Sequence, residues 1–234
     1  MIKLSKRLKA IADMVPLCDT FTDIGTDHGY LPVYLLLNNI CNKSYASDIK
    51  KGPLMRAKEN AERYGIGSDR IRFVLSDGLD RIDCPLNGRN VLSMTGMGGK
   101  TIADILIRGR EKALKYNELI LSPHTKQAEL RRYLSENGYR IIEEKHLVDE
   151  AKLYVIIKAV FSGFSESEEY SDIYYSFGDY IDEALTDEEV REEYIRQYLE
   201  IRELLSNNNS LPQKRLQELS DKEKQYKEVL GFET

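Results

Sequence analysis

Acidic and glycine residues stand together where the first β-type run of the chain ends. Asp23 lies within the run 20–24, and Gly25 and Asp27 follow it directly, before a helical pattern begins. Such a turn, at the carboxyl end of a parallel strand and in front of a helix, is typical of nucleotide-type cofactor sites. Gly25 lets a ligand approach the backbone closely, because glycine has no Cβ atom.

The charge of this turn narrows the class of ligand. The dinucleotide fingerprint GxGxxG suits a pyrophosphate, whereas here Asp23 and Asp27 flank Gly25 and repel phosphate groups. Two carboxylates suit a cationic ligand. S-adenosylmethionine carries a sulfonium and an ammonium group, so the two acids favour it over a nicotinamide dinucleotide. For Asp27 alone, capping of the following helix is the alternative.

Three later strand ends carry polar or glycine residues in the same way. Asp48, 23 residues after Gly25, can accept hydrogen bonds from both ribose hydroxyls of an adenosine. Asp77 can accept one from the adenine amine, with Gly78 making room for the ring, although an ordinary Asp-Gly turn is the alternative. Gly96 begins the run Gly-Met-Gly-Gly, which exposes backbone after the fourth strand. There a flexible loop is the competing interpretation.

The elements that must position these residues alternate between β-type runs and helical patterns, which predicts a doubly wound parallel sheet. The predicted strands are 20–24, 44–49, 71–75, 90–94 and 118–122, and the predicted helices are 5–15, 32–39, 53–64, 100–106 and 127–137. Two further β-type runs, 139–144 and 153–161, have no helix between them and predict an antiparallel pair. This layout is that of class I methyltransferases. We therefore expect an α/β, Rossmann-like methyltransferase domain with a seven-stranded mixed sheet over residues 1–162.

The remaining residues, 163–234, are helical in composition and predict a second, smaller domain. Residues 186–189, Thr-Asp-Glu-Glu, fit a capping box, and an apolar stripe at three- and four-residue spacing follows them. Residues 207–212 interrupt the pattern before a second stripe begins. This arrangement predicts an antiparallel helical hairpin resembling a coiled coil, with a short helix over 170–185 before it.

Composition excludes several classes of protein. No run approaches the roughly 18 apolar residues of a membrane span, and the N-terminus lacks the apolar core of a signal peptide. The three cysteines show no CxxC pairing and the three histidines no metal-ligand spacing, so we expect reduced thiols and no metal. We expect a cytoplasmic protein that does not bind membranes.

The net charge of −5 hides an asymmetry between the two parts of the chain. Residues 1–160 contain 26 Lys and Arg against 20 Asp and Glu, a charge of +6. Residues 161–234 contain 8 against 19, a charge of −11. The positive part is compatible with a phosphate-binding surface, and the acidic part is explained equally well as a solvated helical face.

Several motifs together resemble one known family, the bacterial tRNA (adenine(22)-N1)-methyltransferases. They are Leu-Ser-Lys-Arg-Leu at 4–8, Asp-Ile-Gly-Thr-Asp-His-Gly-Tyr-Leu-Pro at 23–32, Ser-Asp-Ile at 47–49, Gly-Pro-Leu at 52–54, Asp-Gly-Leu at 77–79 and Gly-Met-Gly-Gly at 96–99. The run Ser-Met-Thr at 93–95 departs from the family pattern. The resemblance covers nearly the whole chain, because that family also carries a C-terminal coiled-coil domain.

The resemblance implies methyl transfer from S-adenosylmethionine to N1 of the adenine at position 22 of a tRNA. Neutral adenine N1 has an in-plane lone pair, so we expect direct SN2 transfer without a general base, by alignment and electrostatic stabilisation. For the catalytic side of the pocket we assign Asp27, His28 and Tyr30, although His28 can equally be a packing residue. The residues assigned to cofactor binding are Asp23, Gly25, Thr26, Asp48, Ile49, Asp77, Gly78, Gly96 and Met97.

Basic clusters on three predicted helical faces are the candidate tRNA contacts. The residues assigned to RNA binding are Lys6, Arg7, Arg108, Arg110, Arg131 and Arg132. Each cluster can also be an ordinary solvated face, and the hairpin can bind tRNA or a protein partner. We expect a monomer. The alternatives are a methyltransferase acting on another RNA or a small molecule, and a degenerate methyltransferase fold that serves only as an interaction protein.

Overall fold

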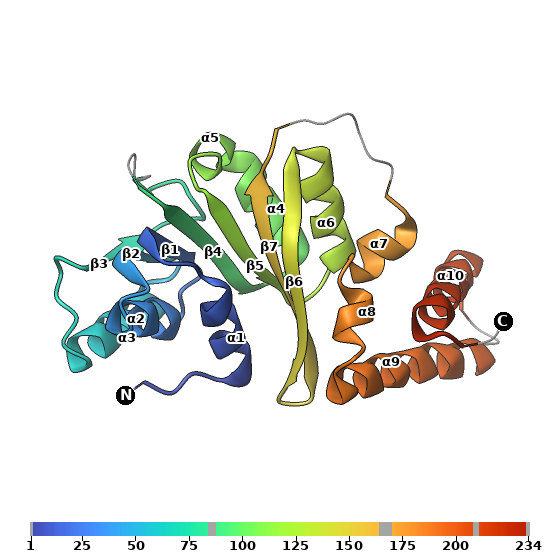
Figure 1. Cartoon of the computed structure of the whole chain (residues 1–234). Helices are drawn as coiled ribbons and strands as arrows, with labels where there is room; N and C mark the ends of the chain where they lie inside the picture. Colours follow the sequence, from blue (N-terminus) through green and yellow to red (C-terminus); the bar gives the residue numbers. More distant parts are fainter. Residues whose placement is uncertain (1, 84–87, 164–169, 208–210, 233–234) are drawn as a thin grey trace.

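A seven-stranded mixed sheet forms the centre of the computed structural model, which describes residues 2–83, 88–163, 170–207 and 211–232 (Figure 1). The strand order is β3-β2-β1-β4-β5-β7-β6. The parallel strands are β1 (Cys18–Ile24), β2 (Cys41–Asp48), β3 (Ile71–Leu75), β4 (Asn90–Met97) and β5 (Glu118–Pro123). Strand β7 (Lys152–Phe161) runs antiparallel to β5 and to β6 (Tyr139–Asp149). The predicted mixed sheet is confirmed.

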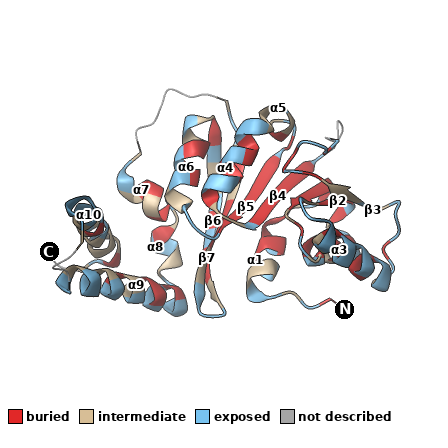
Figure 2. Ribbon diagram, turned by 180° about the vertical axis from the view of Figure 1, so that it is seen from behind, coloured by how far each residue is buried: buried red, intermediate tan, exposed pale blue. Residues whose placement is uncertain are grey.

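Helices cover both faces of the sheet (Figures 1 and 2). One face carries α1 (Lys6–Met14), α2 (Tyr30–Leu37) and α3 (Lys51–Arg63), and the other carries α4 (Gly99–Arg108), α5 (Arg110–Ala113) and α6 (Gln127–Glu136). Two hydrophobic cores lie on the two faces of the sheet, and alternate residues of the central strands point into one or the other. In β5, Ile120 belongs to the core under α1, α2 and α3, and Leu119 and Leu121 belong to the core under α4, α5 and α6. Period-two alternation with both sides buried is what a parallel sheet between two helical layers requires.

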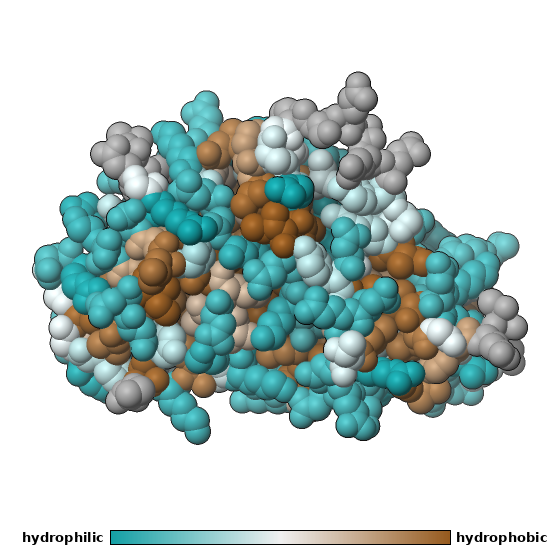
Figure 3. Space-filling model, viewed as in Figure 1, coloured by the Kyte–Doolittle hydropathy of each residue, from teal (hydrophilic) through white to brown (hydrophobic). Residues whose placement is uncertain are grey.

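In the described residues after the sheet, the chain forms the helices α7 (Asp172–Phe177), α8 (Ile181–Ala184), α9 (Glu188–Ser206) and α10 (Gln213–Leu230). Helices α9 and α10 form the predicted hairpin, whose core includes Val190, Tyr194 and Tyr198 from the predicted stripe. Val148 and Leu153, from the β6–β7 hairpin, pack against the same core. In the view of Figure 3, hydrophilic side chains surround separate hydrophobic patches over both parts of the chain.

The structure corrects three local predictions. The single helix expected over 170–185 is two short helices, because Gly178 has φ +84° and ends α7. The cap of α9 is Asp187 rather than Thr186, since Asp187 Oδ1 accepts a hydrogen bond of 3.2 Å from the backbone N–H of Val190. Strand β4 continues to Met97, through an irregularity in its pairing with β5. Within the described residues, no helix is both long enough and apolar enough to cross a membrane.

Candidate active site

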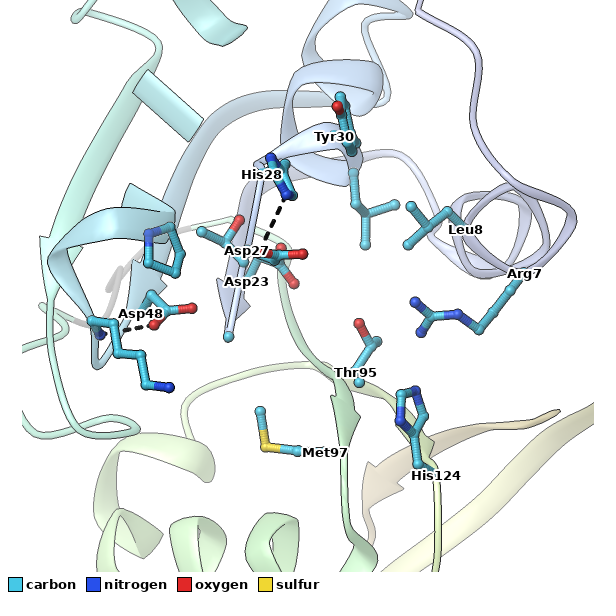
Figure 4. A pocket seen from close by; sticks show the side chains of 16 residues that line it. Arg7, Leu8, Asp23, Asp27, His28, Tyr30, Asp48, Thr95, Met97 and His124 are labelled. Carbon is cyan, nitrogen blue, oxygen red and sulfur yellow. Dashed lines mark hydrogen bonds and ion pairs between the residues drawn. The ribbon is translucent and has the colours of Figure 1, made fainter. Parts of the chain in front are cut away.

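A cavity of about 400 Å³ opens at the carboxyl ends of β1, β2, β4 and β5 (Figure 4). After β1 the chain adds β2 and β3 on one side, and it then crosses to β4 and β5 on the other. Ligands of doubly wound sheets bind at such a switch point. The predicted residues that line the cavity are Asp23, Gly25, Thr26, Asp27, His28, Tyr30, Asp48, Gly96 and Met97.

Asp23 is the most deeply placed acid of the cavity. Its side chain, at the end of β1, is only 3% exposed, and this burial raises its pKa to about 6. Thr26, Ser93 and the positive charge of Arg7 lower the pKa, and Asp48 raises it. Among the described residues Asp23 Oδ1 has no hydrogen-bond partner. A buried, ionised carboxylate that faces a cavity and has one oxygen without a hydrogen-bond partner suits a cationic ligand.

The turn after β1 leaves room for that ligand. The backbone N–H groups of Gly25 and Thr26 both donate to Ser47 O, at 2.8 and 2.9 Å, which fixes the turn against β2. Gly25 has φ +78°, a conformation that favours glycine, and a Cβ atom there would lie 2.8 Å from Met97 Cε. Glycine at this position therefore keeps the space between β1 and β4 open.

Asp48 enters the cavity from the end of β2. Its Oδ1 accepts a 2.8 Å hydrogen bond from the backbone N–H of Lys50, which orients the carboxylate. In doubly wound folds, an acid at the end of the second strand commonly accepts hydrogen bonds from ribose hydroxyls. Asp48 lines the cavity, and its ribose role stays a prediction.

Asp27, His28 and Tyr30 form one wall of the cavity, at the start of α2. The His28 and Tyr30 rings stack with centroids 5.5 Å apart and planes 17° apart. Asp27 Oδ1 lies 3.7 Å from both His28 Nε2 and Arg56 Nη2. Asn60 Nδ2 donates to the His28 carbonyl oxygen at 2.9 Å and so ties this turn to α3. Two aromatic faces beside carboxylates can hold a planar base that becomes positively charged.

Three predicted cofactor residues lie outside the cavity lining. Ile49 is 61% exposed. Gly78 and Asp77 follow β3, and Asp77 Oδ1 and Oδ2 accept hydrogen bonds from Arg108 at 2.9 and 3.1 Å. Arg108 holds the pKa of the Asp77 carboxyl below its usual range. The structure therefore brings a predicted cofactor residue and a predicted RNA residue together as an ion pair.

The predicted RNA contacts fall into different environments. Arg131 cannot reach RNA phosphates, because its side chain is 0% exposed and paired with Glu144; for this residue the prediction was wrong. Arg7 lines the cofactor cavity. Lys6 pairs with Glu189, and Arg132 lies 4.0 Å from the centre of the Tyr175 ring. Arg110 Nη1 donates to Asn137 Oδ1 at 3.3 Å.

Sequence reasoning missed the residues that close the cavity opposite the acids. Arg7, Thr95 and His124 project into that side (Figure 4). His124 follows β5, its backbone N–H donates to Met97 O at 2.9 Å, and burial is the main cause that lowers its pKa. The strand-end rule applied to β1 and β2 would have found His124 at the end of β5. The lining residues not assigned to the cavity beforehand are Arg7, Leu8, Leu31, Lys50, Pro53, Thr95 and His124.

Comparisons with known proteins agree with this geometry. A family model described as a methyltransferase domain matches residues 4–157. The tRNA (adenine(22)-N(1))-methyltransferase of Bacillus subtilis is 35% identical over 158 residues, which span 68% of this chain and 65% of that enzyme.

Solved structures extend the likeness to the C-terminal helices. The crystal structure of the B. subtilis M1A22 tRNA methyltransferase TrmK has a TM-score of 0.82 at 28% identity, covering 98% of this chain and 100% of that one. Mycoplasma capricolum TrmK, in complex with the cofactor product S-adenosylhomocysteine, has a TM-score of 0.83 at 25% identity, with 98% of each chain covered. The sheet topology, the acidic cavity and these similarities establish that the chain belongs to the methyltransferase family that includes the tRNA (adenine(22)-N(1))-methyltransferases.

Proposed function

We propose that this protein transfers the methyl group of S-adenosylmethionine to N1 of the adenine at position 22 of tRNA. The observation that carries the proposal is the buried Asp23 carboxylate, whose Oδ1 has no hydrogen-bond partner among the described residues, in a cavity at the switch point of the sheet. Membership of the family supports the choice of cofactor and acceptor.

The cavity fits the proposed cofactor in charge and in space. Asp23 would hold its ammonium group and Asp48 its ribose hydroxyls, while the glycine at position 25 admits it between β1 and β4. When bound, S-adenosylmethionine supplies an electrophilic methyl group on a positively charged sulfur. A cavity of about 400 Å³ lies within the usual range for small-molecule sites.

The residues of the chain then act mainly by alignment. The adenine N1 lone pair attacks the methyl carbon directly, so no side chain has to remove a proton first. The His28 and Tyr30 rings hold the base, and Asp27 stabilises the positive charge that the base acquires. Because N1 lies on the Watson–Crick edge, the target adenine has to be free of a standard pair or flipped out.

The helical hairpin contributes to tRNA binding in this proposal. A second cavity, lined in part by Lys126 and Lys222, lies between α6 and the α9–α10 hairpin and shares His124 with the first. The two cavities therefore adjoin at His124. Lys126 and Lys222 are cations of the kind that contact a phosphate backbone, and Lys126 also pairs with Glu129.

Calorimetric titration with S-adenosylmethionine, followed by methyl transfer to an unmodified tRNA transcript, tests the proposal. Cofactor binding together with 1-methyladenosine in the tRNA is the expected result. Cofactor binding without RNA methylation would refute the proposed acceptor and favour another RNA or a small molecule. Absence of cofactor binding would refute methyl transfer and favour the interaction-protein alternative.

A further inference from the structure

Arg131 and Glu144 form a fully buried ion pair far along the chain from the predicted site. Arg131 lies on α6 and Glu144 on β6, and both side chains are 0% exposed. Arg131 Nε donates to Glu144 Oε1 at 2.9 Å. A buried ion pair is a weak source of net stability, because removing two charges from water costs much of what their attraction returns. Net stability alone therefore does not explain why this ion pair is present.

The same guanidinium holds the end of α7. Arg131 Nη1 donates to the carbonyl oxygens of Tyr175 and Ser176, at 2.9 and 3.1 Å. Carbonyl groups in the last turn of a helix lack partners within the helix, and they carry the negative end of its dipole. Gly178 packs directly on the pair, since a Cβ there would lie 1.7 Å from Glu144 Oε2. The ion pair and the end of α7 thus form one interlocked unit.

From α7 the contacts continue into the hairpin. Ser176 Oγ donates to Gln225 Oε1 of α10 at 3.0 Å. A second link starts two residues after Glu144 on the same strand, where His146 Nδ1 lies 2.8 Å from the hydroxyl of Tyr194 on α9. Glu144 and His146 point to the same side of β6 because side chains alternate along a strand. The hairpin is therefore linked to α7 by a partly buried hydrogen bond and to β6 by a buried one.

The second cavity lies beside this unit. It measures about 540 Å³ and takes Ser176 from α7, Gln197 from α9, and Lys222 and Gln225 from α10. Ser176 and Gln225 join α7 to α10 by a hydrogen bond, and beside them the rings of Phe177 and Tyr226 pack edge to face with centroids 5.0 Å apart. A shift of α7 would therefore move the α10 side of this cavity.

We propose that Arg131 is a positioning residue, which sets the placement of the α9–α10 hairpin and so acts on tRNA binding rather than on cofactor binding. This inference rests on the proposed function. Arg131 itself touches no RNA, because it is wholly buried. Neither member of the pair lines the cofactor cavity, so we expect the pair to have little direct effect on cofactor binding.

The experiment compares two variants. The single variant carries Arg131→Met alone, and the double variant carries both Arg131→Met and Glu144→Leu. The single variant leaves a buried carboxylate without its partner, which destabilises the protein as a whole. The double variant replaces the pair by apolar side chains of similar size, which avoids the unpaired buried carboxylate of the single variant but removes the hydrogen bonds to α7. Lys58→Met is the control, because Lys58 pairs with Glu62 within α3 and belongs neither to the hairpin nor to the cavity lining.

The double variant is expected to weaken tRNA binding without changing the rate of methyl transfer or the binding of the cofactor. We expect KM for tRNA to rise about tenfold, the equivalent of about 1.4 kcal/mol, while kcat and Kd for S-adenosylmethionine stay within about twofold. The control should behave as the wild type. A double variant with wild-type thermal stability and an unchanged KM for tRNA would overturn the proposal, because the pair would then have only a stability role.

Amide hydrogen exchange tests the same inference without any activity. In the double variant, amides of α7 and α10 should exchange at least about tenfold faster, while those of β1 and β4 stay unchanged. In the wild type, α7 amides should be protected about as well as those of β6. Much faster exchange of α7 in the wild type would contradict the positioning role, even if the variants did not fold. A wild type that showed this protection but methylated no tRNA would refute the proposed function alone.

Discussion

Replacing Asp23 by asparagine should make the protein without cofactor more stable while weakening cofactor binding. The carboxyl has a pKa of about 6 in the folded protein against an ordinary value of 3.8, chiefly because it is buried. The folded state therefore binds the proton more tightly than the unfolded state. The cost of the ionised form is fully present above about pH 6 and disappears as the pH falls through 3.8.

The size of the effect follows from these two pKa values. Their difference corresponds to about 3 kcal/mol, at about 1.36 kcal/mol for each pKa unit. The asparagine amide would find few hydrogen-bond partners in this buried place, and this lack cancels about 1 kcal/mol or more of the gain in stability. The net gain at pH 7 should be about 1–2 kcal/mol, or a rise in Tm of about 2–8 °C for a chain of this length.

The assay is thermal and urea unfolding of Asp23→Asn and wild type at pH 7 and at pH 4, with calorimetry of S-adenosylmethionine at pH 7. Loss of a buried charge partner should weaken binding by about 2–3 kcal/mol, at least about thirtyfold. Asp221→Asn is the control, because this acid lies on the exposed side of α10. A variant that is less stable at pH 7, or that binds the cofactor as the wild type does, would refute the reasoning.

Three further predictions use the same site and the buried contacts around it. Asp48→Ala should weaken S-adenosylmethionine binding about tenfold to a hundredfold in calorimetry, since two ribose hydrogen bonds to a carboxylate are lost, with Tm nearly unchanged; unaltered affinity would contradict the ribose role. Gly25→Ala should lower the free energy of unfolding by about 1–2 kcal/mol, because its φ of +78° is unfavourable for alanine. Gly52→Ala is its matched control, since nothing lies within 4 Å of the added Cβ; equal effects of the two would contradict the prediction. Burial lowers the pKa of His146 to about 3, against 6.5 when unfolded, so this residue's contribution to stability should be lost as the pH falls from about 6.5 toward 3. His146→Gln should flatten that part of the acid unfolding curve, and an unchanged curve would show that His146 does not contribute.

The sheet and much of the cavity lining were predictable from the sequence, because each pattern that indicates them lies within a few consecutive residues. Asp23 and Asp48 stand directly after β-type runs, and the ends of parallel strands meet at one edge of the sheet. The ion pair of Asp77 could not be predicted in this way, because its partner Arg108 lies 31 residues further along the chain. A pair of that separation leaves no local pattern in the sequence.

The error at Arg131 has the same physical origin. A basic residue on an amphipathic helix usually faces solvent, and Arg132 beside it does so. Arg131 is buried because Glu144 and the carbonyl groups of Tyr175 and Ser176 surround its guanidinium. These partners come from a strand and from a helix 44 and 45 residues away, so only the packed structure reveals them.

Mapping the methylated base in tRNA tests the central claim most directly. An unmodified transcript with adenine at position 22 and a matched transcript with guanine there would each be incubated with the protein and S-adenosylmethionine. Nuclease digestion and mass spectrometry would then locate the added methyl group. The account predicts 1-methyladenosine at position 22 of the first transcript and no methylation of the second. Methylation at another position, or equal methylation of both transcripts, would contradict it.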